Sequence, residues 1–260
     1  MKKAVIISAP HSCENISSAF RNRIALSDFE IWQFSDPFTD KTSNFPKAFS
    51  IHLAKNHRIL GDLNRDRNAK DIFRKKDFYN RNIWKSGKNL TIIEKKKLLN
   101  CFWDSFRNSI LESFKKASLQ KISEILFIDH HNTAIDHPAN FEEYLPPIVL
   151  GNFGEINTGK KISKKKLSAT PQIIQKLKKI LQKNFPELTI ELNKTYSGSS
   201  IVRFIRDEIM PKFPNIKINA LILEYNLNFI FNPLSQRVDK IALKKITKGF
   251  NKSLEDYLNF

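Results

Sequence analysis

The chain has 260 residues, and its 44 Lys and Arg residues outnumber its 26 Asp and Glu residues, which gives a formal net charge of +18. Hydrophobic residues make up 41% of the chain, enough to bury a core, and this excludes a wholly disordered protein. The two cysteines, Cys13 and Cys101, exclude a disulfide framework and suit a reducing compartment. The positive charge favours an acidic partner, whether nucleic acid, an anionic membrane surface or a carboxylate substrate.

No segment predicts export or a membrane span. The apolar stretch that follows the first lysines ends at Ser8, which is shorter than the roughly 7–15 residues of a signal-peptide core. The most apolar later stretch, residues 218–231, is interrupted by Glu224 and several Asn residues, whereas a membrane helix needs about 20 apolar residues. We therefore expect a soluble cytoplasmic protein.

Short apolar runs predict the strands of a buried sheet. The three clearest are rich in β-branched residues and cover Ala4–Ser8, Ile125–Asp129 and Ile218–Glu224. Two further candidates are Glu30–Phe34 and Leu188–Leu192.

Apolar residues at helical spacing predict three helices, at Ile92–Ser118, Pro171–Asn184 and Ser235–Leu258. Strands that alternate with helices indicate an α/β fold with a largely buried, mainly parallel sheet. Because no stretch resembles an interdomain linker, we expect residues 1–260 to form a single domain. The densest charge run, Lys160–Lys166, has no interleaved aromatic residues to stack bases, so a solvated loop is the favoured interpretation.

Ionisable residues follow each of the three clearest strands. Pro10-His11-Ser12-Cys13-Glu14 follows the first, Asp129-His130-His131-Asn132 ends the second, and Glu224-Tyr225-Asn226 ends the third. In open α/β sheets, ligands bind outside the carboxyl ends of the strands. This convergence is the strongest functional signal in the sequence.

A metal site is the chemistry that these residues suggest. A common hydrolytic zinc site has two histidines, one carboxylate and an open position for water. Such a ligand set can also accept other divalent ions, and zinc is the commonest hydrolytic choice. His11, Glu14 and one of His130 and His131 supply that set. On a strand, Asp129 and His131 share a face, which favours His131 as the ligand and Asp129 as the group that orients it.

Glu224 ends a very apolar strand, where a buried carboxylate is costly unless it has a partner. A metal-bound water or an arginine would be such a partner, and in a hydrolase this glutamate would be the general base. The alternative is a half-exposed strand end with a salt bridge, for example to Arg237.

Two polar segments are candidates for substrate binding. In Gly61–Asn68, Arg65 or Arg67 would hold a carboxylate and Asn64 would add an amide hydrogen bond; on composition alone, a surface loop of paired Asp and Arg is the simpler interpretation. Tyr196-Ser197-Gly198-Ser199-Ser200, followed by Arg203, indicates a glycine turn before a helix, where backbone N–H groups can face an anion.

The order of these motifs is similar to that of a known family. His-Ser-Cys-Glu at 11–14, Asp-Leu-Asn-Arg at 62–65, Asp-x-His-Asn at 129–132, Tyr-Ser-Gly-Ser-Ser at 196–200 and a strand that ends in Leu-Glu resemble the N-formylglutamate amidohydrolase family. That family in turn resembles zinc carboxypeptidases. The resemblance implies a three-layer αβα sandwich around a mixed, largely parallel sheet, one bound Zn²⁺ and a hydrolase acting on C–N bonds.

The resemblance also implies residue roles. His11, Glu14 and His131 would hold the metal, Glu224 would be the base, and Arg65 would meet a substrate carboxylate. Arg203 would be a second carboxylate contact, and Asn64 and Tyr196 would also line the substrate site. Cys13 stands where the family more often has glycine, and Asn132 where serine is usual, so the first turn, the ligand set and the pocket are points of difference.

The predicted function is hydrolysis of an amide or formamide bond in a small acidic N-acyl amino acid such as N-formylglutamate. The first alternative is a carboxypeptidase-like zinc hydrolase that acts on a peptide or cell-wall fragment, because the same residues suit it. The second alternative is a basic polyanion-binding protein without catalysis, which would use Lys160–Lys166 and the helix after it. Nucleic acid is not the expected partner, and the sequence does not choose an oligomeric state.

Overall fold

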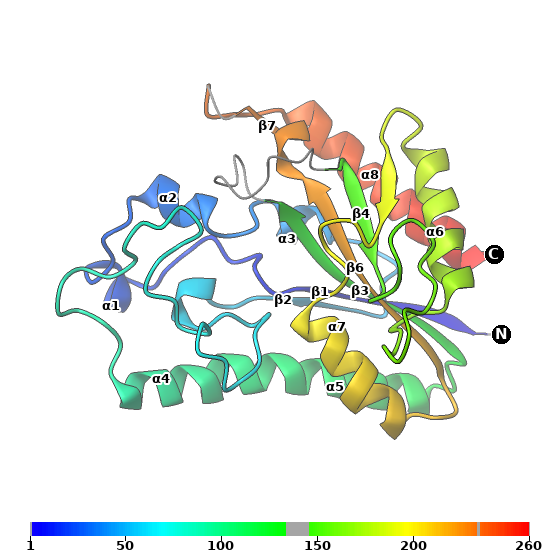
Figure 1. Cartoon of the computed structure of the whole chain (residues 1–260), viewed down its shortest axis with the longest axis horizontal. Coiled ribbons are helices and arrows are strands. Elements are labelled where there is room, and N and C mark those ends of the chain that lie inside the picture. The colour runs from blue at the N-terminus through cyan, green and yellow to red at the C-terminus, as the bar shows by residue number, and fades with distance from the viewer. Residues whose placement is uncertain (1, 134–145, 233–234, 260) are drawn as a thin grey trace.

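The computed structural model describes residues 2–133, 146–232 and 235–259, and in these residues a six-stranded sheet is covered by helices on both faces (Figure 1). The strand order is β2-β1-β3-β6-β4-β5. Strands β2, β1, β3 and β6 are parallel to one another, whereas β4 runs antiparallel to β6 and pairs in parallel with β5. A separate two-stranded ribbon pairs β7 with β8. The strands are β1 (Lys3–Ala9), β2 (Ser50–Leu53), β3 (Glu124–Thr133), β4 (Ile148–Gly151), β5 (Ile190–Leu192), β6 (Lys217–Asn226), β7 (Phe231–Asn232) and β8 (Arg237–Val238).

The helices form the two outer layers. Helices α6 and α8 pack on one face of the sheet, and α5 and α7 pack on the other (Figure 1). Short helices lie in the N-terminal half, where a third apolar cluster forms beside the sheet. The helices are α1 (Ser18–Arg21), α2 (Asp28–Gln33), α3 (Thr39–Thr42), α4 (Ile92–Leu98), α5 (Ser105–Leu119), α6 (Pro171–Asn184), α7 (Ser200–Phe204) and α8 (Lys240–Asn259).

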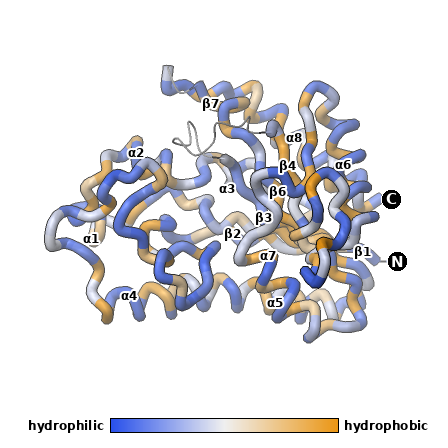
Figure 2. The backbone as a smooth tube through the Cα atoms, viewed as in Figure 1, coloured by the Kyte–Doolittle hydropathy of each residue, from blue (hydrophilic) through white to orange (hydrophobic). Residues whose placement is uncertain are grey.

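Apolar residues concentrate in the strands and on the inner sides of the helices, as the hydropathy colouring shows (Figure 2). Side chains on neighbouring positions of β3 face opposite cores: Leu126 and Ile128 join the α6/α8 side, while Ile125 and Phe127 join the α5/α7 side. This alternation is the period-two geometry of a strand that is buried on both faces. The expected three-layer α/β fold with a mixed, mostly parallel sheet is confirmed.

The long predicted helices form where their sequence signals lie. Helix α6 begins at Pro171 after the Thr170 cap and ends at Asn184, as predicted. The segment predicted as one helix from Ile92 is α4 and α5 joined by a π-helical turn, Leu99–Asp104. The last helix begins at Lys240 rather than at residue 235, because the Asp239 carboxylate caps its first N–H groups and the residues before it form β8.

The prediction of a strand at Glu30–Phe34 is wrong, because this segment lies mostly in helix α2. Ser27 and Glu30 form a reciprocal capping box, in which the Ser27 hydroxyl accepts from Glu30 N and the Glu30 carboxylate accepts from Ser27 N. Four strands, β2, β4, β7 and β8, were not predicted. The first two have four residues each and the last two have two residues each, which is too short for a clear strand pattern. The predicted strand at Leu188–Leu192 corresponds to β5.

The described residues include no helix that is both long enough and apolar enough to cross a bilayer. All seven residues of Lys160–Lys166 are exposed, in an irregular segment that precedes α6.

Candidate active site

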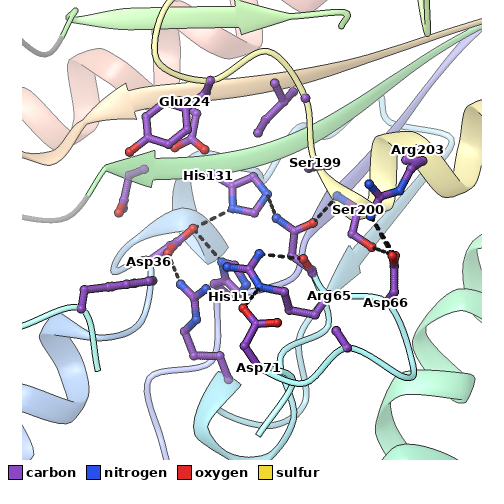
Figure 3. A pocket seen from close by; sticks show the side chains of 18 of the residues that line it. His11, Asp36, Arg65, Asp66, Asp71, His131, Ser199, Ser200, Arg203 and Glu224 are labelled. Atoms are coloured by element: carbon purple, nitrogen blue, oxygen red, sulfur yellow. Dashed lines mark hydrogen bonds and ion pairs between the residues drawn. The ribbon is translucent and has the colours of Figure 1, made fainter. Parts of the chain in front are cut away.

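A cavity of about 530 Å³ opens at the carboxyl ends of the parallel strands. The segment after β1 contributes His11 to it, β3 contributes His131 and β6 contributes Glu224 (Figure 3). Asn64 and Arg203 come from the loop after β2 and from α7. The structure therefore brings together His11, His131 and Glu224, one residue from each of the three strand ends that the sequence predicted to converge.

Two histidines and one aspartate form the centre of this cavity. His11 Nδ1 lies 3.2 Å from Asp36 Oδ2, and His131 Nδ1 lies 2.8 Å from the same oxygen. One ligand atom from each residue lies within 4.8 Å of the other two, and all three side chains are buried. Two imidazole nitrogens and a carboxylate oxygen at this spacing can hold a metal ion.

The far nitrogen of each imidazole is held by a second carboxylate. His11 Nε2 lies 2.7 Å from Asp62 Oδ1, and His131 Nε2 lies 3.0 Å from Asp129 Oδ2. Asp129 is itself held by the hydroxyls of Ser8 and Ser199. In metal sites, a carboxylate that accepts from one ring nitrogen directs the other toward the metal. Both rings are thus oriented with Nδ1 toward Asp36, and Asp129 lies where the sequence analysis expected the orienting group.

Glu14, predicted as the third ligand, is not brought into this cluster. Its carboxylate accepts from Phe38 N at 3.2 Å, and burial is the main cause that raises its pKa. Asp36 takes the carboxylate position because the loop after α2 returns to the first strand end, where Asp36 N donates to the His11 backbone oxygen. No local motif marks Asp36 as a ligand, since this position depends on where α2 ends. Cys13 is also outside the cluster, with its thiol near Asn15 O.

The cluster is strongly polarised by its buried charges. Burial alone would raise the pKa of both Asp36 and Asp62. For Asp36, His11 and His131 outweigh burial and lower the pKa below its usual range. For Asp62, Arg58 and His11 do the same. Burial lowers the pKa of His131, but Asp129 and Asp36 raise it well above 6.5. The carboxylates therefore stay ionised, as metal ligands and their supports must be.

Glu224 lies beside this cluster as the register partner of His131 on the adjacent strand. Its side chain is on the same side of the sheet as His131, because β6 alternates as β3 does. Burial, partly opposed by His131 and reinforced by Asp36 and Asp129, raises the pKa of Glu224 to about 8. A carboxyl group with a pKa near neutrality is suited to take up and release a proton during catalysis.

His130 has a different environment although it is adjacent to His131. It faces the α6/α8 core, where its ring contacts the rings of Tyr225 and Phe250 at centroid distances of 5.6 and 5.1 Å. Burial lowers its pKa to about 3, so His130 is neutral at pH 7. Of the two candidate histidines, His131 is the one that the structure places in the cluster.

Asn64 supports the cavity wall. Its Oδ1 accepts from Ser200 N at 2.9 Å and from Ile201 N at 3.3 Å, which fixes the start of α7. Tyr196 lines the cavity and is half-buried, and burial followed by the charges of Glu224 and Asp36 raises its pKa.

Arg65 and Arg203 also line the cavity, and each pairs with an aspartate, Asp71 for Arg65 and Asp66 for Arg203 (Figure 3). Arg67 is directed away, toward Asp104.

The sequence analysis missed Arg58, which is buried against the cluster. Its guanidinium lies 2.6 Å from Asp62 and 3.6 Å from Asp36, and it contacts the rings of Phe34 and Phe78. Its position is recognisable only in the folded chain, because Asp36 and Asp62 come from different loops.

The fold and the cavity define the class of protein: an α/β enzyme whose polar site lies at the carboxyl ends of parallel strands and centres on a potential metal-binding cluster. More particularly, the chain belongs to the N-formylglutamate amidohydrolase family, whose family model matches residues 3–226. It is therefore a hydrolase that acts on C–N bonds, as the motifs predicted.

Solved structures with the same fold include an N-formylglutamate amidohydrolase from Ralstonia eutropha JMP134, with a TM-score of 0.69 and 14% identity over 99% of this chain and 95% of that one. A gene product of Agrobacterium tumefaciens has a TM-score of 0.63 and 12% identity over 98% of this chain and 92% of that one. At these identities the likeness concerns the fold. No curated protein sequence matches the chain.

Proposed function

We propose that this protein is a zinc-dependent amidohydrolase that cleaves the amide or formamide bond of a small acidic N-acyl amino acid such as N-formylglutamate. The observation that carries the proposal is the arrangement of His11 and His131. Each imidazole has its Nε2 against a buried carboxylate and its Nδ1 beside Asp36, with Glu224 on the adjacent strand.

The donor set suits zinc. His11, Asp36 and His131 would hold the ion through two imidazole nitrogens and one carboxylate oxygen, the ligand types of a common hydrolytic zinc site. Asp62 and Asp129 would keep both rings in the tautomer that leaves Nδ1 free to bind. A bound zinc ion polarises a carbonyl and activates water for attack.

Glu224 would transfer a proton from the attacking water to the leaving amine. In ionised form it would accept the proton of the attacking water, and the protonated carboxyl group would then donate that proton to the leaving amine nitrogen. Glu224 lines the cavity in which a substrate would bind, beside His131, one of the proposed metal ligands.

Arg65 would bind a carboxylate of the substrate, Arg203 a second one, and Asn64 and Tyr196 would complete the wall of the site. The guanidinium groups suit this role because their planar N–H groups match the geometry of a carboxylate.

The direct test is Glu224→Gln, which removes the proton carrier and keeps the size of the side chain. We expect kcat for N-formylglutamate to fall about 10²- to 10⁴-fold, the usual contribution of general acid–base catalysis, while bound zinc, measured by elemental analysis, is retained. Turnover close to that of the wild type would contradict the role of Glu224. A protein without bound divalent metal would contradict the metal site.

A substrate panel separates this function from the carboxypeptidase-like alternative. Formylated, acylated and peptidyl amino acids would be compared at equal concentration, each with an acidic and a neutral side chain. Preference for the formyl acidic compound supports the proposal, and preference for a peptide contradicts it.

A further inference from the structure

Three arginines line the cavity, and each is engaged by internal carboxylates; two of them, Arg65 and Arg203, form partly exposed pairs. Arg65 and Arg203 line the cavity, and so do their partners Asp71 and Asp66 (Figure 3). Arg65 Nε donates to Asp71 Oδ2 at 2.8 Å, an oxygen that also accepts from Arg74 Nη2 at 3.2 Å. Arg203 Nη2 donates to both oxygens of Asp66 at 2.9 Å. The two guanidinium groups proposed to bind an acidic substrate are therefore each paired with an aspartate.

Both pairs are exposed enough to be exchanged. The side chains of Arg65 and Asp71 are 32% and 50% exposed, and those of Arg203 and Asp66 are 47% and 63% exposed. Exposed ion pairs contribute little to stability, because water screens them and both side chains lose freedom. By contrast, Arg58 and Asp62 are 5% and 1% exposed, so a ligand would not displace that pair.

The presence of two such ion pairs in one cavity favours a substrate with two carboxylates. A monocarboxylate can replace only one aspartate, whereas a dicarboxylate can offer one carboxylate to each arginine. Until they are displaced, Asp66 and Asp71 also repel an incoming anion through their own charge.

We propose that Asp66 and Asp71 are specificity-determining residues that compete with the two carboxylates of a dicarboxylate substrate for Arg203 and Arg65. The inference rests on the proposed function for the identity of the site, and it concerns binding rather than the chemical step. Replacing either aspartate lowers KM for a dicarboxylate substrate.

Titration calorimetry of the purified protein with glutarate tests this inference without turnover. Asp66→Asn and Asp71→Asn each remove a competing charge, and the amide oxygen at position 66 can still accept from the Ser200 hydroxyl, which now donates to Asp66 Oδ1 at 2.8 Å. We expect each variant to bind glutarate about three- to tenfold more tightly, from a lost repulsion across several Å of solvated cavity.

Asp104→Asn is the matched control, because Asp104 makes a similar exposed bidentate pair with Arg67, and neither residue lines this cavity. Its glutarate affinity is expected to equal that of the wild type. Unchanged or weaker binding in Asp66→Asn and Asp71→Asn overturns the inference, and so does the absence of glutarate binding in all proteins. Tighter glutarate binding without hydrolysis contradicts only the proposed function, whereas hydrolysis with unchanged affinities contradicts only this inference.

Discussion

His57 makes a prediction about acid stability that follows from its two hydrogen bonds. The residue is fully buried beside Arg58, with Nε2 2.9 Å from Ile31 O and Nδ1 accepting from Ile59 N at 3.1 Å. This arrangement fits a neutral imidazole, because a second proton on Nδ1 would break the bond from Ile59. Burial is the main cause that lowers the pKa of His57 to about 3 from its ordinary value of 6.5.

The expected magnitude follows from proton linkage. Between pH 6.5 and 3 the unfolded chain binds a proton at His57 that the folded protein does not bind, so the free energy of unfolding decreases as the pH falls. The contribution of this residue is a loss of about 0.2 kcal/mol at pH 7 and of about 2 kcal/mol at pH 5.

The perturbation is His57→Gln, whose amide N–H can still donate to Ile31 O but which does not titrate. Urea unfolding of the wild type and the variant at pH 7, 6 and 5, followed by circular dichroism in a chelating buffer, gives the two pH dependences. We expect the variant to lose about 2 kcal/mol less than the wild type between pH 7 and pH 5.

The comparison is a difference between slopes, so a general loss of stability in the variant does not affect it. His52 and His130, whose pKa values burial lowers to about 4 and about 3, contribute equally in both proteins. If His57→Gln does not fold, His57→Asn, which can keep the acceptor for Ile59 N, replaces it. Equal losses in both proteins would refute the reasoning about the neutral His57.

Three further predictions concern the proposed metal site. Asp36→Asn is expected to weaken zinc binding more than about 100-fold, because it removes the only charged ligand of the proposed set. Glu14→Gln is expected to leave zinc binding unchanged. If equilibrium dialysis shows the reverse, Glu14 is the ligand. Asp62→Asn is expected to weaken zinc binding about 10- to 100-fold through the lost orientation of one imidazole, and calorimetry measures this. Zinc binding at pH 7 is expected to release a proton from His131, because Asp129 and Asp36 raise its pKa well above the ordinary value of 6.5. Equal binding heats in buffers of different ionisation enthalpy would contradict this.

The sequence was sufficient for the parts of the site that lie on regular strands. His11, His131 and Glu224 follow or end three apolar runs, and the ends of parallel neighbouring strands must lie at one edge of the sheet. The period of a strand also separated His131 from His130.

The remaining parts depend on how loops fold. Asp36 reaches His11 because α2 ends at Gln33 and the chain then returns to the first strand end, and a capping box rather than apolar spacing determines that helix. Arg58 acquires its role only when Phe34, Asp36 and Asp62 surround it. Such contacts join distant positions, so no local pattern in the sequence indicates them.

The tandem histidines of β3 provide no redundancy, because alternation along the strand gives them different neighbours. An insertion of one residue early in β3 would place His130 at the position that His131 now occupies in the cavity. The same shift would move Asp129 into the apolar core beside Phe250, where no imidazole orients toward it and a carboxylate is costly. The cavity would keep a histidine but lose the carboxylate that orients it. The number of residues in β3 is therefore as important for the site as their identity.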